Sequence, residues 1–405
     1  MNLIEDLRWR GLLAQTTDEK ALLEALKKPT TLYVGFDPTA PSLHAGNLVV
    51  LLVLRRFQLA GHNPIALVGG ATGLVGDPSG KNEERTLNST EIVEGWVNRI
   101  RNQVSAFLDF DAPKNPAAVV NNLDWTSPLS AIEFLRDIGK HFSVNQMLSK
   151  DSVAARLEGG GISYTEFSYQ VLQSYDFLEL YRRNNCTLQV GGSDQWGNIV
   201  AGLDLIRRVE QGSGHALTVP LLMKADGTKF GKTAGGSVWL DPEMTSPYAF
   251  FQFWLNSDDK DVINFLKVFS FKSHAEITEL EKSHNENPGL REAHRALARE
   301  LTSLVHSEET TERVEAAARA LFGQGELSEL DEATLASALA ELPRTTVSSS
   351  EEIPTWVDLL AATGVVDSKS AARRIVKEGG AYLNNEKISG EDFRPSKSDF
   401  LCGKY

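Results

Sequence analysis

The chain has 405 residues, of which 41% are hydrophobic and 23% charged, enough for about two to three globular domains with sizeable cores. Its formal net charge of −13 argues against a protein that coats nucleic acid through bulk electrostatics, but it leaves room for RNA binding by local basic patches. The two cysteines, Cys186 and Cys402, lie far apart and predict neither a disulfide framework nor a zinc site. The eight histidines show no pair at ligand spacing beside a carboxylate, so we expect no metal site.

No segment of the chain predicts a membrane span or an export signal. The longest apolar run begins at Leu48, but Arg55 and Arg56 interrupt it long before it reaches the length of a bilayer-crossing helix. The first residues, MNLIEDLRWR, carry acidic side chains and lack the apolar core of a signal peptide. We therefore expect a cytoplasmic protein without a membrane partner.

Strand-like and helix-like segments alternate over roughly the first 220 residues. TLYVGF (31–36), NPIALVGG (63–70) and CTLQVGG (186–192) are typical of buried strands, whereas residues 47–61 predict a helix that ends at a glycine. This alternation predicts an α/β fold with a Rossmann-like, doubly wound parallel sheet, and the segment 105–142 is interpreted as an insertion with its own helices. From residue 247 onward the strand signals fade and a mostly helical stretch begins. The expected domains are a Rossmann-like domain over 1–223 with a helical insertion at about 113–160, a connector over 224–246, a helical domain over 247–322, a linker over 323–353 and a small α+β module over 354–405.

A glycine-rich segment, GGATGLVGDPSGK (69–81), follows the second predicted strand and suggests a phosphate-binding loop. It does not match the P-loop, because only three residues separate Gly76 from Gly80 and Asn82 follows Lys81. It does not match the dinucleotide-binding fingerprint either, because Ala71 stands where the second glycine belongs. Taken alone, the segment is equally compatible with a tight turn after a strand.

Two other segments form a pair. HAGN (44–47) stands at the entrance of the first long helix, where His44 and Asn47 can face one anion together with the helix N-terminus. KFGKT (229–233) places Lys229 and Lys232 in a glycine-rich loop far along the chain. Alone, the first segment is better interpreted as a helix cap with a surface histidine, and the second as solvated charge.

Together the two segments resemble the signatures of class I aminoacyl-tRNA synthetases, although Asn47 replaces the second histidine of the first signature. Four blocks narrow the resemblance: YVGFDPTAPSLHAGN, GGATGLVGDPSGK, SYQVLQSYD and QVGGSDQWGNI. They resemble, in order and spacing, the bacterial-type tyrosyl-tRNA synthetases over roughly residues 30 to 400.

The resemblance implies tyrosine activation by ATP, with release of pyrophosphate, followed by transfer to the terminal ribose of tRNA(Tyr). ATP would enter with Mg²⁺, and no prosthetic group or dedicated metal cage is expected. The attacking group is the carboxylate of the substrate, so catalysis would rest on positioning and on charge stabilisation at the phosphates. The residues implied in phosphate binding and catalysis are Thr39, His44, Asn47, Lys81, Arg85, Lys229, Lys232 and Thr233. Those implied in holding the rest of ATP are Gly35, Asp37, Gly192 and Asp194, with Lys232 also in contact with it.

The amino-acid pocket is expected on one helix. Tyr169, Gln173 and Asp176 are separated by four and three residues, which places them on one helical face. Alone, this stripe is equally an exposed polar face. The resemblance assigns Tyr169, Gln173 and Asp77 to the substrate ammonium, Tyr33 and Asp176 to the phenolic hydroxyl, and Gln195 to the carboxylate.

The segment from residue 354 predicts helix, turn, helix, strand and a tight turn at Asn384 and Asn385. This order resembles the small RNA-binding module of many tyrosyl-tRNA synthetases, and we expect the module to lack its last strand. The basic residues of its second helix, implied in RNA binding, are Lys369, Arg373, Arg374 and Lys377. The resemblance also implies a homodimer.

Two alternatives stay open. A tryptophanyl-tRNA synthetase would share the catalytic fold, but Tyr33, Asp176 and the C-terminal module argue against it. A regulatory RNA-binding protein on an inactive scaffold would be expected to lose signature lysines, whereas Lys81, Lys229 and Lys232 are all present.

Overall fold

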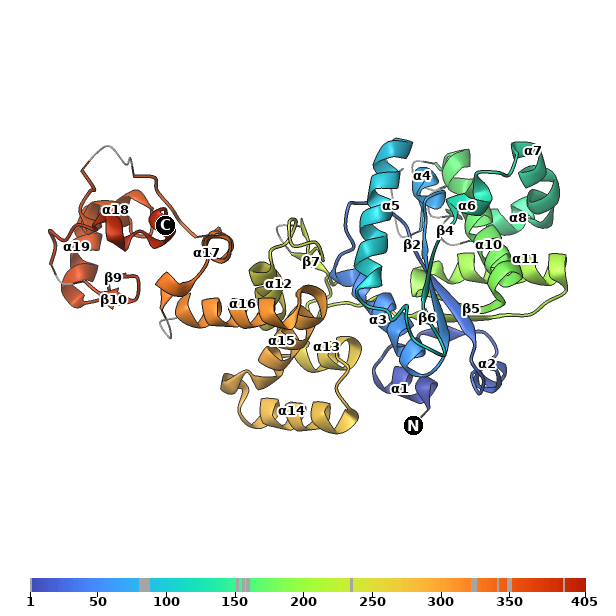
Figure 1. Ribbon diagram of the computed structural model, residues 1–405, viewed down its shortest axis with the longest axis horizontal. Helices are drawn as coiled ribbons and strands as arrows, with labels where there is room; N and C mark the ends of the chain where they lie inside the picture. The colour runs from blue at the N-terminus through green and yellow to red at the C-terminus, as the bar shows by residue number, and fades with distance from the viewer. Residues whose placement is uncertain are drawn as a thin grey trace. The chain divides into compact units, whose positions relative to one another are not determined.

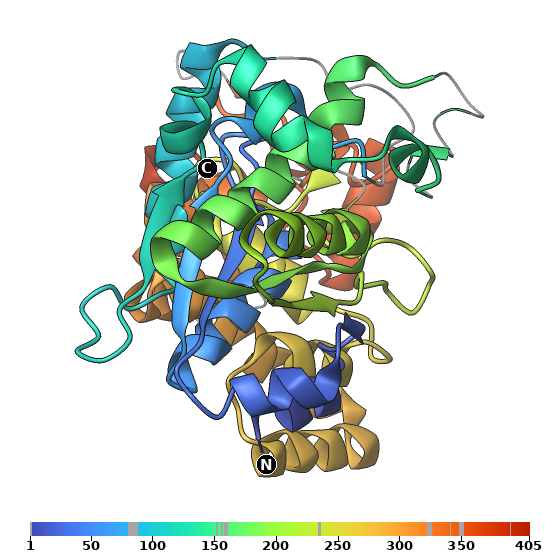
Figure 2. The same ribbon diagram turned by 90° about the vertical axis from the view of Figure 1, so that its right-hand side faces the viewer.

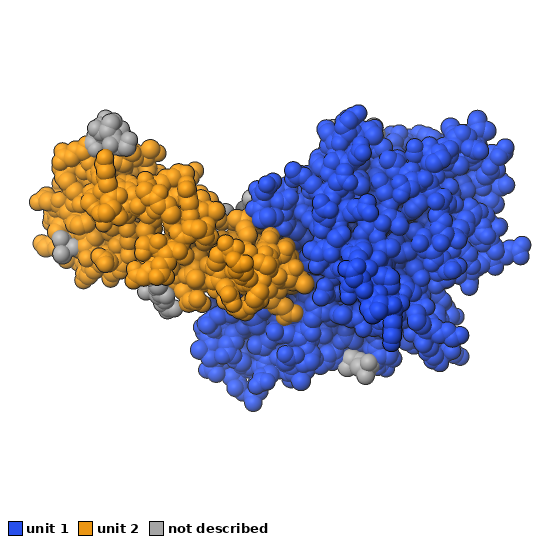
Figure 3. All heavy atoms as spheres, viewed as in Figure 1, with its two compact units in different colours: residues 1–244, 257–297 blue, residues 245–256, 298–405 orange. Residues whose placement is uncertain are grey.

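The computed structural model describes residues 2–79, 88–150, 153–154, 157, 161–233, 236–321, 326–340, 342–347, 352–388 and 390–405. Its internal contacts divide the chain into two compact units, one of residues 1–244 and 257–297 and the other of residues 245–256 and 298–405 (Figure 3). No helix in the described ranges combines the length and apolar character needed to cross a membrane.

The first unit is built on a six-stranded sheet with the order β1-β6-β5-β2-β3-β4. All neighbouring pairs are parallel except β1 and β6, so the predicted Rossmann-like sheet is confirmed, with one antiparallel edge strand added. The strands are β1 (Gln15–Thr16), β2 (Thr31–Phe36), β3 (Asn63–Val68), β4 (Ala118–Asn121), β5 (Cys186–Gly192) and β6 (His215–Val219).

Helices cover both faces of this sheet, which is why its central strands are apolar along nearly their whole length. Figure 1 shows α3 (Ala45–Leu59) and α5 (Thr90–Ser105) on one side, and α10 (Tyr164–Asn184) and α11 (Trp196–Glu210) on the other. In β3, every residue from Pro64 to Val68 is buried. Shorter helices of this unit are α1 (Leu3–Trp9), α2 (Glu19–Ala25), α4 (Thr72–Val75), α6 (Leu123–Thr126), α7 (Ala131–Glu133) and α8 (Val144–Leu148).

The chain reverses its direction of winding between β2 and β5. From β2 it proceeds through β3 to β4, and it then crosses back to β5 and β6 on the other side of β2. In open α/β sheets, such a switch point leaves a crevice at the carboxyl ends of the two strands, and ligands bind there. Here those ends are Gly35–Asp37 and Gly191–Asp194.

The expected helical insertion at about 113–160 needs a correction, because its residues 118–121 form β4, which pairs with β3. The strand has only four residues, and each of them is only partly buried at the edge of the sheet. Such a short segment carries too weak a periodic pattern to be told from a loop. The described residues after this strand include several short helices, among them a π-helix over Phe134–Ile138 and a 3₁₀ turn over Gly139–His141.

The helical domain expected over 247–322 does not form one unit: residues 245–256 and 298–405 belong to the second unit, whereas residues 257–297 cluster with the first. They form α13 (Val262–Phe269), α14 (His274–Glu286) and the 3₁₀ turn Pro288–Leu290, and Figure 2 shows the N-terminal helix beside them. A buried arginine contributes to this clustering, because Arg10 donates to the backbone oxygens of Lys267, Ser270 and Lys272 at 2.8–3.1 Å. His274 also lies 2.8 Å from Asp6 of α1. No pattern in the sequence marks these long-range bonds.

The second unit contains the C-terminal module. Its helices α18 (Trp356–Ala362) and α19 (Lys369–Glu378) pack around Val357, Ala372 and Val376. The strands β9 (Tyr382–Leu383) and β10 (Glu386–Lys387) follow as a hairpin, with Asn384 and Asn385 at φ of 49° and 69°, as a two-residue turn of this kind requires. The predicted helices, strand and turn are thus confirmed. Before them lie α12 (Pro247–Leu255), α16 (Glu308–Leu321) and α17 (Glu332–Leu339), and α15 (Glu292–His306) runs from the first unit into the second.

Candidate active site

A cavity of about 650 Å³ opens at the switch point of the sheet. Its walls come from the ends of β2 and β5, the N-terminus of α3, the middle of α10 and the loop around residue 230. The predicted site residues that line it are Tyr33, Gly35, Asp37, Thr39, His44, Asn47, Asp77, Tyr169, Gln173, Asp176, Gly192, Asp194, Gln195 and Lys229. Its size is that of pockets which enclose small organic ligands.

For four other predicted site residues, the structure describes either the backbone alone or nothing. Lys81 and Arg85 lie outside the described residues. Lys232 and Thr233 form the short strand β7 (Lys232–Thr233), which pairs with β8 (Gly236–Ser237), but only their backbone is described.

The two signature segments, far apart in the sequence, lie against each other. The amide of Ala45 donates to the oxygen of Val238 at 2.8 Å, and Leu240 donates to the oxygen of Leu43 at 2.9 Å. Gly231 has φ of +86°, and a Cβ at this position would lie 3.0 Å from the amide nitrogen of Gly46. Only glycine combines this backbone conformation with so close an approach. The lysine loop is therefore held directly at the N-terminus of α3.

At this N-terminus, His44 and Asn47 cap the helix reciprocally. Asn47 Oδ1 accepts from the amide of His44 at 3.0 Å, and His44 Nδ1 accepts from the amide of Gly46 at 3.0 Å. Because Nδ1 accepts, the neutral ring carries its proton on Nε2, which is then a donor. The sequence allowed two interpretations of HAGN, a helix cap and an anion-binding site. The structure is compatible with both at once, since a capped helix N-terminus retains its positive dipole.

Asp176 lines the cavity and is itself buried. Its two carboxylate oxygens accept hydrogen bonds from Trp125 Nε1 at 2.8 Å and from Asn122 Nδ2 at 2.9 Å. Burial nevertheless raises the pKa of Asp176 to about 7, because desolvation penalises the charged form more than the two donors stabilise it.

Tyr33 reaches the same cavity from the middle of β2. Its side chain is 1% exposed, and its hydroxyl is buried without a hydrogen-bond partner among the described residues. Burial, followed by the nearby charge of Asp176, raises its pKa well above the usual range, so the hydroxyl stays protonated. An unpaired buried hydroxyl costs free energy unless a ligand supplies the partner.

A second polar network connects α10 to the loop after β3. Tyr169 donates to Asp37 Oδ2 at 2.6 Å, and Thr72 donates to Asp37 Oδ1 at 2.7 Å. Asn122 Nδ2, which also bonds Asp176, lies 3.0 Å from Thr72 Oγ1. A Cβ on Gly69 would lie only 2.2 Å from Asp37 Oδ1, so the glycine that opens the GGATG segment leaves room for this carboxylate.

A third network joins the same loop to the start of α11. Gln195 Nε2 donates to Asp77 Oδ2 at 2.7 Å. Asn198 Nδ2 donates to Gln173 Oε1 at 3.1 Å and to Gln195 Oε1 at 3.3 Å. The structure thus brings together the residues that the sequence places on three separate segments.

The sequence analysis missed several residues of these networks. Asn122 and Trp125 hold Asp176, Thr72 holds Asp37, and Asn198 connects Gln173 with Gln195. Asn122 and Trp125 stand in the segment NNLDW (121–125), which follows an apolar tetrapeptide directly. Polar side chains after a short apolar run are typical of the end of a strand. This pattern was overlooked because the segment was interpreted as helical.

The four basic residues of α19 lie in the second unit and are exposed. Lys369 pairs with Asp358 at 2.7 Å, and Arg373 lies 3.7 Å from Glu391. Arg374 and Lys377 share the helix and have no ion pair among the described residues. Part of the basic charge is therefore already balanced by acidic neighbours.

The comparisons with known proteins agree with this architecture. The family described as tRNA synthetases class I (W and Y) matches residues 25–323, and the tyrosine–tRNA ligase SYY-like C-terminal domain matches residues 334–405. The sheet, its crevice and the first of these matches define a class I tRNA synthetase.

Similarity to individual proteins shows which kind of class I tRNA synthetase the chain is. The chain is 62% identical to the tyrosine–tRNA ligase of Streptomyces coelicolor over 100% of this chain and 95% of the relative, and 58% identical to that of Thermobifida fusca over 100% and 96%. Among solved structures, it is similar to a C-terminally truncated mitochondrial tyrosyl-tRNA synthetase of Aspergillus nidulans, with a TM-score of 0.71 and 30% identity over 79% of this chain and 94% of the other. The chain therefore belongs to the tyrosine–tRNA ligases of the bacterial type.

Proposed function

We propose that the crevice activates L-tyrosine with ATP to tyrosyl-adenylate and pyrophosphate, and that the enzyme then transfers the tyrosyl group to the 3′-terminal ribose of tRNA(Tyr). One observation carries the choice of amino acid: two buried residues that line the cavity present one unpaired hydroxyl, that of Tyr33, near one carboxylate, that of Asp176. A phenolic hydroxyl is the group that complements both, because it accepts from Tyr33 and donates to Asp176.

The same pair would reject phenylalanine. Phenylalanine leaves the buried Tyr33 hydroxyl without a partner and offers the buried Asp176 carboxylate no donor beyond Trp125 and Asn122, and an unsatisfied buried polar group penalises the wrong ligand. Discrimination of tyrosine from phenylalanine is the general example of this effect, with a factor of about 10⁵ reached without editing.

The substrate ammonium is expected beside Tyr169, Gln173 and Asp77. All three line the cavity, and the hydrogen bonds of Gln195 to Asp77 and of Asn198 to Gln173 orient their polar atoms. Gln195 would lie near the substrate carboxylate. Asp37, which is bonded to Tyr169 and stands two residues after Gly35, borders both the amino-acid and the ATP parts of the crevice.

In the first step, a carboxylate oxygen of tyrosine forms a bond to the α-phosphorus. The bond from this phosphorus to the bridging oxygen breaks, and pyrophosphate leaves with the electron pair. The nucleophile is already ionised, so no enzyme base is needed, and the barrier falls through positioning and through neutralisation of phosphate charge. ATP enters as its Mg²⁺ complex.

Donors for the phosphates surround the N-terminus of α3. His44 would donate through Nε2, Thr39 through its hydroxyl and Asn47 through its amide nitrogen, since Asn47 Oδ1 is engaged in the cap. Lys229 contributes positive charge from the facing loop, and we assign the same role to Lys232, Lys81 and Arg85 from the resemblance, with Thr233 as a hydroxyl donor to the pyrophosphate. Gly192 and Asp194, at the end of β5, are proposed to bind the ATP ribose.

In the second step, a terminal ribose hydroxyl of the tRNA attacks the carbonyl carbon of the adenylate. An ester forms, AMP leaves, and the hydroxyl proton is released. We propose that α19 contacts tRNA phosphates through Lys369, Arg373, Arg374 and Lys377, and that the enzyme acts as a cytoplasmic homodimer.

The test is tyrosine-dependent exchange between ATP and pyrophosphate without tRNA, with phenylalanine and tryptophan in parallel. Exchange with tyrosine alone is the expected result. Exchange with tryptophan would overturn the role given to Tyr33 and Asp176, and absence of exchange with all three would favour an inactive scaffold.

A further inference from the structure

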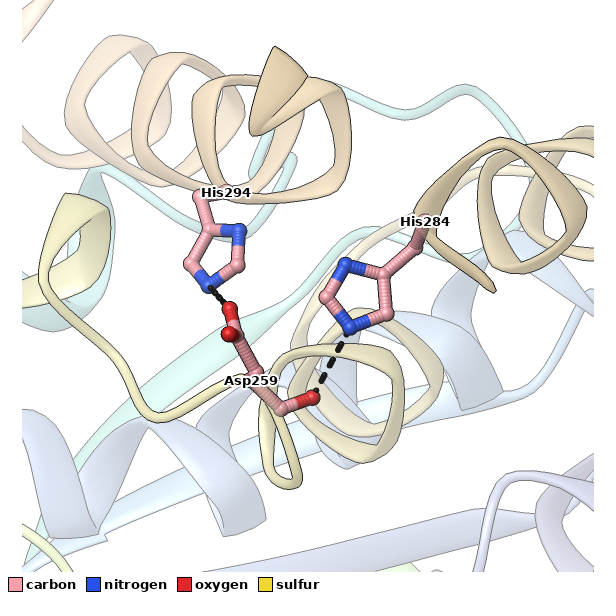
Figure 4. Close-up of side chains that lie close together, drawn as sticks. All are labelled: Asp259, His284 and His294. Carbon is pink, nitrogen blue, oxygen red and sulfur yellow. Dashed lines mark hydrogen bonds and ion pairs between the residues drawn. The ribbon is translucent and has the colours of Figure 1, made fainter. Parts of the chain in front are cut away.

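Outside the crevice, two histidines and one aspartate gather in the first unit, on segments that the sequence analysis did not connect. Asp259 stands in the turn before α13, His284 in the last turn of α14 and His294 in the first turn of α15 (Figure 4). One potential ligand atom from each residue lies within 4.8 Å of the others, and the two imidazole rings are 5.6 Å apart between centroids.

The hydrogen bonds fix the tautomer of both rings. His284 Nε2 lies 3.0 Å from the backbone oxygen of Asp259, and His294 Nε2 lies 3.1 Å from the backbone oxygen of Ser257. Backbone oxygens only accept, so each Nε2 must carry a proton. In the neutral rings, each Nδ1 therefore presents a lone pair.

Both of these Nδ1 atoms are buried and have no hydrogen-bond partner among the described residues. Figure 4 shows them on the sides of the two rings that face each other. The side chain of His294 is 0% exposed, and burial, followed by the charge of Arg291, lowers its pKa, so the neutral ring is favoured. One electron-pair acceptor placed between two facing lone pairs would satisfy both of them.

We propose that the His284–His294–Asp259 cluster is a binding site for a transition-metal ion of the Zn²⁺ type. Imidazole nitrogens with one carboxylate are suitable donors for Zn²⁺, and metal-bound histidines commonly donate their other N–H to a backbone oxygen, as both rings do here. Water would complete the coordination on the side of Asp259, whose side chain is 60% exposed.

Binding must draw the ligands together. Zinc–nitrogen bonds of about 2.0–2.1 Å place two tetrahedral ligands about 3.3 Å apart, less than the 4.8 Å within which one nitrogen of each ring and one Asp259 oxygen lie. Asp259 Oδ1 lies 3.2 Å from His294 Nε2, the protonated nitrogen, so the carboxylate must turn towards the Nδ1 atoms to bind the ion. The partly buried His284 at the end of α14 and the exposed Asp259 are the groups that can move. The ion would then connect α14, α15 and the turn at residue 259.

The experiment is calorimetric titration of the metal-free full chain with ZnCl₂, together with titration by Co²⁺ followed by visible absorption. His284→Ala is the test variant, and His141→Ala, which removes a histidine outside the cluster, is the matched control. We expect one Zn²⁺ per chain in the wild type and the control, with affinity at least tenfold lower in His284→Ala. Zn²⁺ should also raise the melting temperature of the wild type and of His141→Ala, but not that of His284→Ala.

Asp259→Asn gives a second variant in case His284→Ala does not fold, because Asp259 is exposed. It should bind Zn²⁺ more weakly than the wild type and alter the Co²⁺ spectrum. Equal stoichiometry and affinity in wild type and the folded variants, or the absence of a bound ion in the wild type, would overturn the proposal. Exchange between ATP and pyrophosphate serves as a check of fold, since none of these residues lines the crevice.

Discussion

In the crevice of the first unit, the side chains expected to recognise tyrosine are largely buried and, except for the Tyr33 hydroxyl, held by hydrogen bonds from neighbouring side chains, whereas the four basic side chains of α19 in the second unit are exposed. Asp176 has two donors within 2.9 Å, while the side chain of Lys369 is 63% exposed even in its ion pair. Buried polar groups discriminate through geometry, because an unsatisfied partner there is costly. Exposed cations act through charge, which solvent and salt screen.

The difference predicts how the two regions respond to substitution. In the crevice, single atoms should matter, and the effects should be specific to tyrosine. On α19, only the summed charge should matter, and the effects should appear solely when tRNA is present. Four experiments test this contrast, in order of expected effect.

The largest effect is expected for Asp176→Asn. The oxygen of the new amide can accept from Trp125 or from Asn122, but its NH₂ group then faces the other donor. The side chain also no longer offers a charged acceptor to the phenol. We expect kcat/KM for tyrosine in ATP–pyrophosphate exchange to fall by about a hundredfold or more, because hydrogen bonds to charged groups contribute about 1.5–3 kcal/mol and an unpaired donor adds to the loss. Discrimination against phenylalanine should fall with it. Kinetics unchanged for both amino acids would remove Asp176 from the recognition of the phenol.

The next effect concerns pH. The pKa of Asp176 is raised to about 7, so the ionised fraction is roughly one-tenth at about pH 6 and roughly nine-tenths at about pH 8. If the ionised form is the one that accepts from the phenol, KM for tyrosine should fall about tenfold as pH rises across this range. The same linkage acts on folding with the opposite sign: the raised pKa of this acid contributes stability at low pH that is lost as pH rises towards about 7.

Asp176→Asn is the control for the pH experiment, since it removes the titrating group. Its remaining KM for tyrosine should vary little between about pH 6 and about pH 8. A wild-type profile that is flat over this range would show that the carboxyl does not change its charge there.

A smaller effect is expected for Tyr33→Phe, which removes only the unpaired hydroxyl. We expect kcat/KM for tyrosine to fall about five- to tenfold, as for the loss of one neutral hydrogen bond. The melting temperature should not fall, because a buried hydroxyl without a partner contributes nothing favourable to the free protein. A large loss of stability with normal tyrosine kinetics would make the hydroxyl structural instead.

The smallest effect is expected on α19. Replacing Arg374 and Lys377 together by alanine should raise KM for tRNA about three- to tenfold. KM for tyrosine and KM for ATP in ATP–pyrophosphate exchange should not change. Lys369 and Arg373 provide the matched pair, because acidic neighbours already offset their charge, and their double replacement should have a weaker effect. Loss of exchange in either double variant would contradict the division of labour between the two regions.

Much of the fold could be predicted from the sequence because the signals are local. The apolar runs of β2, β3 and β5, the alternation with helices and the two asparagines of the β9–β10 turn are each visible within about ten residues. The four-residue strand β4 was missed because its pattern is too short, and the attachment of residues 257–297 to the sheet was missed because it rests on Arg10, more than 250 residues away.

Many residues that line the site were likewise predicted from sequence motifs, among them His44, Asp176 and Gln195. Only the tertiary structure decided how these residues are held: Trp125 and Asn122 on Asp176, Asn198 between two glutamines, and the lone hydroxyl of Tyr33. The same holds for His284, His294 and Asp259, which no spacing connects. By itself, the sequence determined which chemical groups the chain possesses and which local elements carry them. Their partners and their burial arise from long-range packing, because hydrogen bonds and desolvation depend on neighbours in space and not on neighbours in the chain.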